Sequence, residues 1–88
     1  MGIVWVMYQT ISEKIDVLGI FRDASFTPKK FKWNHRDYTI DEVTSIHERR
    51  DGGRLMRQYA VLSGGNLFLL EHDYSQETWT LEQIWMEG

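Results

Sequence analysis

Apolar and polar residues alternate along the second half of the chain, over residues 43–85. This period-two pattern is typical of β-strands that bury one face. It is interrupted at Gly52-Gly53, at Gly64-Gly65 and over residues 75–78. Because a two-residue Gly-Gly connection is a strong hairpin signal, the sequence predicts a ribbon of antiparallel strands joined by three turns.

The Gly-Gly loops also predict which residues face each other. Across the first loop the pairs are Asp51–Arg54, Glu48–Arg57, Ile46–Tyr59 and Thr44–Val61. Across the second they are Val61–Phe68, Tyr59–Leu70 and Arg57–His72, and a four-residue loop over 75–78 adds Tyr74–Trp79, His72–Leu81 and Phe68–Trp85. Both Gly-Gly loops leave the same residues of the shared strand on one face, so the two registers agree.

The predicted register gives the ribbon two faces. Face A, the side that carries Tyr59, Phe68 and Trp79, is expected to form one wall of a hydrophobic core. Its other predicted members are Thr44, Ile46, Val61, Leu70, Tyr74, Leu81 and Trp85. Face B, the opposite side, carries an apolar patch that the N-terminal segment or a second subunit is expected to cover. The patch comprises Val43, Ala60, Leu62, Leu67, Leu69, Ile84 and Met86.

The first half of the chain also favours strands. Residues 3–8 and 15–21 are rich in β-branched and aromatic side chains, and residues 22–27 are expected to form a polar link. Phe31 and Trp33 alternate with polar residues, and a turn over residues 34–37 predicts a hairpin. Its expected pairs are Trp33–Tyr38, Phe31–Ile40 and Lys30–Asp41. We therefore predict an all-β domain of about six strands, either a small, strongly bent antiparallel meander or an open barrel.

Length and composition indicate one domain. The chain has 88 residues and no Cys, which excludes disulfides, thiolate nucleophiles and zinc–cysteine sites and fits a reducing cytoplasm. Residues 13–86 are expected to form the core, and residues 1–12 an N-terminal extension with room for an extra strand. The apolar residues 2–8 are too few to span a bilayer and lack the basic flank of a signal peptide, so we expect a cytoplasmic protein without membrane contact.

One set of residues has a recognisable spacing: Pro28, Phe31, Trp33, Arg36, Tyr38, Ile40 and Val43, followed by an aromatic-rich hairpin that ends near Asp73 and residues 79–81. The pattern resembles a family of short uncharacterised bacterial proteins, a domain of unknown function, whose core is P-x-x-F-x-W-x-G-R-x-Y-x-V. His35 stands where the family turn usually has Gly. The resemblance extends over about residues 13–85 and implies a compact β domain in a bacterial cytoplasm. It names no catalytic residue.

No sequence motif indicates catalysis or a cofactor. The three histidines, His35, His47 and His72, fall in a turn and on opposite faces of the predicted ribbon, so they are not expected to converge on a metal. No nucleophile elbow, P-loop or dinucleotide-binding fingerprint occurs. We expect a protein that is not an enzyme and binds neither a metal nor a cofactor.

Two binding functions remain as alternatives. The first is a protein-interaction or self-associating module, a homodimer or a partner of another protein, with an interface at Val43, Leu62, Leu67, Leu69, Ile84 and Met86. The second is a nucleic-acid-binding module that uses a basic sector over residues 29–36 and 49–57. Its candidate contacts are Lys29, Lys30, Lys32, Arg36, Arg49, Arg50 and Arg54. The net charge of −3 and the interspersed acids favour the first alternative.

Overall fold

The computed structural model describes residues 6–87, and this part of the chain folds into β-strands without a helix. The strands are β1 (Val6–Arg22), β2 (Ser25–Trp33), β3 (Arg36–Thr39), β4 (Glu42–Asp51), β5 (Arg54–Ser63), β6 (Asn66–Asp73) and β7 (Thr78–Glu87). The predicted all-β class is confirmed, with seven strands in place of about six. Within residues 6–87 there is no helix of the length and apolarity needed to cross a bilayer.

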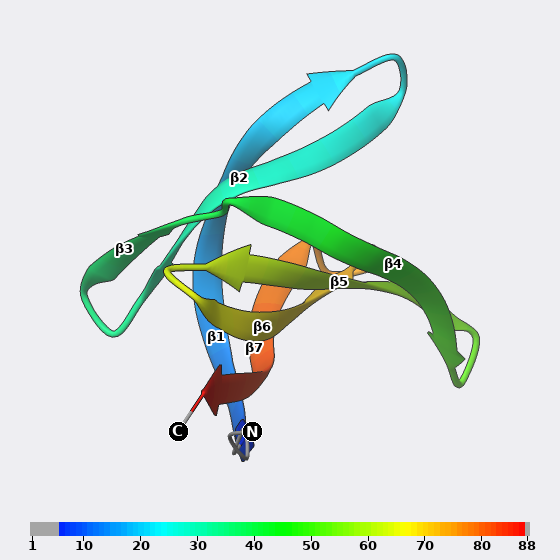
Figure 1. The fold of residues 1–88 in the computed structure, drawn as a ribbon. Coiled ribbons are helices and arrows are strands. Elements are labelled where there is room, and N and C mark those ends of the chain that lie inside the picture. Colours follow the sequence, from blue (N-terminus) through cyan, green and yellow to red (C-terminus); the bar gives the residue numbers. More distant parts are fainter. Residues whose placement is uncertain (1–5, 88) are drawn as a thin grey trace.

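All seven strands form one antiparallel sheet in the order β3-β2-β1-β7-β6-β5-β4. The sheet is strongly bent and does not close, so β3 and β4 form its edges (Figure 1). The distal half of β1 and the first half of β2 make an arm that projects from the body at the top of Figure 1. Residues 6–12, which the sequence assigns to an N-terminal extension with room for an extra strand, belong to β1, and residues 6–10 pair with β7 at the centre of the sheet. Residues 3–5 of the first predicted strand lie outside the described residues.

Four of the turns are two-residue loops in which both residues have positive φ. Gly52-Gly53 and Gly64-Gly65 take this conformation without steric cost, as their sequence predicts. Asp23-Ala24 and Asn34-His35 adopt it as well, at φ values between 52° and 64°. The polar link predicted over residues 22–27 is therefore a tight turn flanked by β1 and β2.

The register predicted at the Gly-Gly loops is largely correct. Every expected β5–β6 pair is present, as are Asp51–Arg54, Glu48–Arg57 and Ile46–Tyr59. The pair Thr44–Val61 is wrong, because a β-bulge between Val43 and Ser45 places Val43 opposite Val61. Val43 therefore joins the core side of the sheet in place of Thr44.

Two other hairpins are shifted by two residues from their predicted registers. In β2–β3, the tight Asn34-His35 turn sets Phe31 opposite Tyr38 and Trp33 opposite Arg36. In β6–β7, Asp73 pairs with Thr78, so the loop covers residues 74–77. His72 faces Trp79 and Leu70 faces Leu81 in that hairpin. A shift of two residues changes the partner of a side chain but not the face on which it lies, so these residues stay on their predicted faces.

Bulges bend the sheet where β1 and β7 lie side by side. Leu81 pairs with Leu70 but Gln83 pairs with Leu69, which leaves Glu82 as the extra residue of β7. The β1–β7 register shifts at the same level, where Ser12 has a φ of 54°. Beyond this bend the alternation is reversed, so Ile84 and not Trp85 packs on face A opposite Phe68.

The core lies between face A and the β2–β3 hairpin that folds over it. The buried apolar members are Ile15, Phe31, Ile40, Tyr59, Val61, Phe68, Leu70, Leu81 and Ile84. Phe31 stacks on Tyr38 with ring centroids 4.9 Å apart and meets the edge of Phe68 at 5.1 Å. The cross-sheet contacts between these aromatic rings fill one end of face A.

Candidate functional site

The other end of face A is open and forms a pocket of about 480 Å³. The pocket lies between the β1–β2 arm and the part of the sheet formed by β5, β6 and β7. Five aromatic side chains line it: Phe21, Phe26, Tyr59, Tyr74 and Trp79. A pocket of this size with a mostly apolar lining and a few polar groups is typical of a ligand site.

The arm wall of the pocket depends on one glycine. Phe21 and Phe26 pair across the arm, and the ring of Phe26 reaches Trp79 with centroids 5.7 Å apart. A Cβ atom at Gly19 would overlap both the Phe26 ring and the carbonyl oxygen of Thr27. Gly19 thus leaves the space in which Phe26 packs, whereas Phe21 remains 73% exposed at the pocket mouth.

The floor of the pocket is a stack of rings on adjacent strands. His72 stacks on Trp79 with centroids 4.5 Å apart, and its ring also meets Tyr74 at 4.6 Å. Burial lowers the pKa of His72 from its ordinary value of 6.5, which favours the neutral imidazole. The floor therefore presents flat, largely uncharged surfaces suited to an aromatic group.

Arg57 supplies the cationic group of the lining. Its Nη2 donates a hydrogen bond to Glu48 at 2.9 Å, and the guanidinium lies 5.6 Å from the centre of the Tyr74 ring. Its Nε is buried and has no hydrogen-bond partner among residues 6–87. The hydrogen bond that Arg57 donates to Glu48 raises the pKa of Arg57, so the guanidinium is charged. A charged guanidinium beside aromatic rings is suited to bind a carboxylate through the N–H groups that Glu48 does not occupy.

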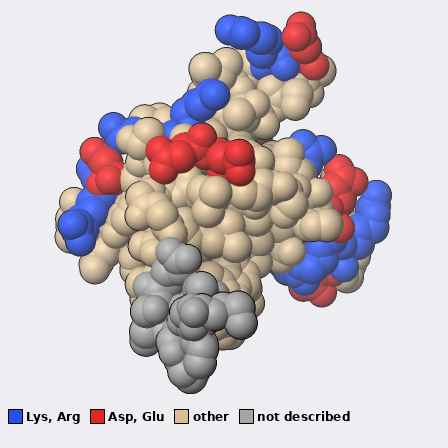
Figure 2. All heavy atoms as spheres, in the orientation of Figure 1, with Lys and Arg blue, Asp and Glu red and all other residues tan. Residues whose placement is uncertain are grey.

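The predicted basic sector is divided between opposite ends of the molecule. The β2–β3 turn lies at the left of Figure 1 and the β4–β5 turn at the right. Figure 2 shows blue atoms in separate groups with red atoms beside them. Lys30 lies 3.6 Å from Asp37, and Arg49 and Arg54 form ion pairs with carboxylates of β6. The seven candidate contacts therefore do not form one continuous surface for a phosphate backbone.

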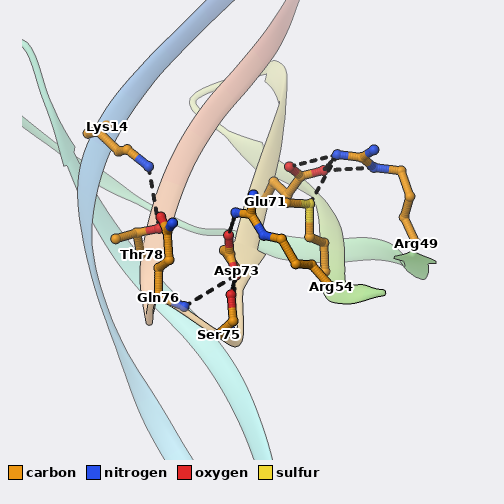
Figure 3. Close-up of polar contacts among 9 residues, drawn as sticks. Lys14, Arg49, Arg54, Glu71, Asp73, Ser75, Gln76 and Thr78 are labelled. Atoms are coloured by element: carbon orange, nitrogen blue, oxygen red, sulfur yellow. Dashed lines mark hydrogen bonds and ion pairs between the residues drawn. The ribbon is translucent and has the colours of Figure 1, made fainter. Parts of the chain in front are cut away.

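Two of these ion pairs belong to a polar network on face B (Figure 3). Arg49 donates to both carboxylate oxygens of Glu71, which also accepts a hydrogen bond from Gln58 at 2.8 Å. Arg54 pairs with Asp73, which also accepts hydrogen bonds from Ser75. The Arg54 bond lowers the pKa of Asp73, and the bond to Glu71 raises the pKa of Arg49. Glu71 and Asp73 are buried, so the network ties the β4–β5 tip to β6.

The residues of the predicted protein interface fall on both faces of the sheet. Val43, Ile84 and Met86 pack on the core side, because the bulges at Thr44 and Glu82 reverse the alternation. Leu62, Leu67 and Leu69 remain on face B and are half-buried. Leu67 pairs with Trp85, whose ring lies 5.4 Å from that of Tyr8. Residues 6–10 pair with β7 next to this patch.

The histidines lie apart, as their strand positions predict. His35 is in the β2–β3 turn, His47 is on face B of β4, and His72 is on face A of β6. Over the described range, residues 6–87, no group of three His, Asp or Glu side chains is arranged to hold a metal ion.

Sequence reasoning missed the pocket because it missed the arm. Residues 22–27 contain no glycine, so the tight Asp23-Ala24 turn gives no conventional hairpin signal. The available signal is the symmetric spacing of Phe21 and Phe26 about that dipeptide, which predicts a cross-strand aromatic pair. The predicted register pairs Trp79 with Tyr74 and His72 with Leu81, so it does not bring His72 and Trp79 together.

Comparison with models of protein families, with curated proteins and with solved structures finds no match for this chain. The resemblance to the bacterial family therefore stays a prediction.

Proposed function

We propose that this protein is a non-catalytic interaction module that binds a segment of another protein in the open end of face A. The segment presents an aromatic side chain to the ring floor and a carboxylate to Arg57. We place the protein in a bacterial cytoplasm, which the lack of Cys and the family resemblance support.

The observation that carries the proposal is the pocket of about 480 Å³ with its aromatic lining. An aromatic side chain is a common energetic anchor of a protein interface, and it fits a pocket of flat apolar walls. Phe21 is 73% exposed and Tyr74 38% exposed at this pocket, although apolar side chains of this size stabilise a protein when covered. A bound aromatic ring would cover both.

The charge of the pocket favours a peptide over an oligonucleotide. Arg57 is the cationic side chain of the lining, and Glu48 already pairs with it. Single-stranded nucleic acid needs a row of cations beside its stacking platforms, because each phosphate carries a charge. The guanidinium N–H groups that Glu48 leaves free are enough for one carboxylate of a peptide.

The test is a titration with the blocked tripeptide acetyl-Phe-Thr-Glu-amide, followed by the NMR signals of the Trp79 indole and the His72 ring. We expect the chemical shifts of these signals to change and to reach saturation as peptide is added. The variant Phe21→Ser should bind the peptide about tenfold more weakly, because one wall of the anchor site is removed. Leu18→Ser is the matched control: Leu18 is 66% exposed on the same strand but does not line the pocket. It should bind like the wild type.

Three results would overturn the proposal. One is no shift with the tripeptide, or equal affinities of Phe21→Ser and Leu18→Ser. The second is tighter binding of a thymidine oligonucleotide than of the tripeptide. The third is a two-chain mass in sedimentation that Phe21→Ser reduces to one chain, since a second copy would then fill the pocket.

A further inference from the structure

A gap in the sheet continues from the aromatic pocket. Residues 25–28 of β2 and residues 43–46 of β4 line a second pocket of about 430 Å³. Phe26 lines this pocket and the aromatic pocket alike. The two hollows therefore lie next to each other, with Phe26 as their common wall. We call the gap between these two stretches the seam.

Both sides of the seam are strand edges that lack a neighbouring strand. β2 pairs with β3 only over residues 30–33, so within residues 6–87 no strand adjoins residues 25–28 on the side away from β1. β4 is the last strand of the sheet and pairs only with β5. Unpaired N–H and C=O groups on a strand edge are a template for another strand.

The seam is held at a fixed width at one end. The Ile40 N–H donates to the Lys29 carbonyl at 2.9 Å, and the Asp41 N–H donates to the Leu62 carbonyl at 2.7 Å. These bonds tie the β3–β4 connection to β2 on one side and to β5 on the other. The seam is thus closed beside Ile40 and open toward the arm and the aromatic pocket.

The rest of the β4 edge is protected against pairing by charge. The seam carries no charge, although Pro28 offers no N–H and the β4 side contains the bulge at Thr44. Residues 48–51 of β4 are all charged, and β3, the other sheet edge, has four residues. Charges and short strands are the usual means of preventing strand addition. Residues 43–46 carry no charge, and Ile46 is 51% exposed. The part of the edge that is free to pair is the part that faces β2.

We propose that the partner segment enters the seam as an extended β-strand that hydrogen-bonds to β2 and β4 together and so closes the sheet. This inference rests on the proposed function, because it describes how the same segment lies. β2 and β4 run in opposite directions, so the inserted strand is parallel to one and antiparallel to the other. Alternate side chains of an extended strand point to the same side of the sheet. The aromatic and acidic residues that face the core side are therefore two positions apart in the inserted strand.

The test uses the blocked hexapeptide acetyl-Thr-Ile-Thr-Phe-Thr-Glu-amide, which extends the tripeptide by the length that would occupy the seam. We expect it to bind at least tenfold more tightly than the tripeptide. Two further versions carry N-methyl groups on the odd or on the even residues, which remove backbone donors and keep the side chains. Successive N–H groups of a strand point to opposite sides. A strand held by two edges should therefore lose roughly tenfold or more in either version, at a few-fold per lost hydrogen bond.

The outcomes separate this inference from the proposed function. Loss of affinity in only one methylated version means pairing with one edge, and no loss in either means side-chain capture alone. Both results overturn the inserted strand and leave the aromatic pocket as the binding site. If the tripeptide itself does not bind, the proposed function is wrong.

A pair of protein variants gives an independent check. Ile46→Lys puts a charge on the seam and should weaken the hexapeptide about tenfold without affecting the tripeptide. His47→Lys, the adjacent exposed residue on face B, is the control and should bind both peptides normally. Equal hexapeptide affinities of the two variants would contradict strand insertion.

Discussion

Face A has a closed end and an open end, although the same strands run through both. At the closed end Phe31 is 1% exposed and lies between Tyr38 and Phe68. At the open end Phe21 is 73% exposed and Phe26 reaches only as far as Trp79. Both ends are rich in aromatic residues, so composition does not distinguish them.

The difference is made by the short strand β3. Where β3 adjoins β2, the hairpin is wide enough to form a second layer over the sheet, and Tyr38 of β3 stacks on Phe31. Over residues 25–28, toward the arm, β1 is the only described strand that adjoins β2. Alternation in a strand therefore predicts which face is apolar, but a second layer decides whether that face becomes core or binding surface.

The largest expected effect is the loss of stability on truncation at the closed end. Phe31→Ala removes a fully buried ring and leaves a cavity, so we expect the free energy of unfolding to fall by about 3–5 kcal/mol. Phe21→Ser at the open end should change it by no more than about 0.5 kcal/mol. Urea unfolding followed by Trp fluorescence measures both. Similar losses in the two variants would show that the open end is core after all.

An intermediate effect is expected at Gly19, where the arm joins the body. Gly19→Ala forces the Phe26 ring and the Thr27 carbonyl to move, so the unfolding free energy should fall by roughly 1–3 kcal/mol. Amide exchange should increase in the arm before the closed end is affected.

A double-mutant cycle provides the control for that effect. Phe26→Ala removes the ring that the new methyl group would meet, so the cost of Gly19→Ala should be smaller in that background. An unchanged cost would assign the strain to the Thr27 carbonyl alone and would contradict the role of Gly19 in placing Phe26.

Much of the fold could be predicted because turn chemistry and alternation agree. The Gly-Gly loops fix the register from residue 45 to residue 73, and this register placed Tyr59, Phe68 and Leu70 on one buried face. A one-residue error there would have put apolar side chains in water, so the sequence specifies the register strongly.

The bulges and the non-glycine turns could not be predicted in the same way. Nothing in the local sequence around Glu82 or Thr44 marks an extra residue, because the bend is stabilised by packing between distant strands. Ala24 and His35 adopt positive φ under the same tertiary constraint. Sequence alone therefore does not place Val43, Ile84 and Met86 on the core side, and it does not predict the pocket, because both depend on where the alternation reverses and where the arm folds back.

The smallest expected effect is a pH dependence that belongs to the open end alone. Burial lowers the pKa of His72, so below its ordinary value of 6.5 the unfolded chain binds more protons than the folded chain. His72 therefore contributes stability that is present above pH 6.5 and is lost as the pH falls through its lower folded pKa. Phe31 and Phe68 at the closed end carry no titratable group.

The measurement compares wild type with His72→Phe, which keeps a ring between Trp79 and Tyr74 but cannot titrate. From pH 7.5 to pH 5 the wild type should lose stability relative to the variant, because only its ring takes up a proton over this range. Burial raises the pKa of Glu82, which acts in the opposite direction because its protonation favours the folded state. That contribution is common to both proteins and cancels in the difference. Parallel pH profiles of the two proteins would show that the His72 ring is as accessible to water in the folded chain as in the unfolded chain. The open end would then lack the water-excluding ring stack that an aromatic anchor needs.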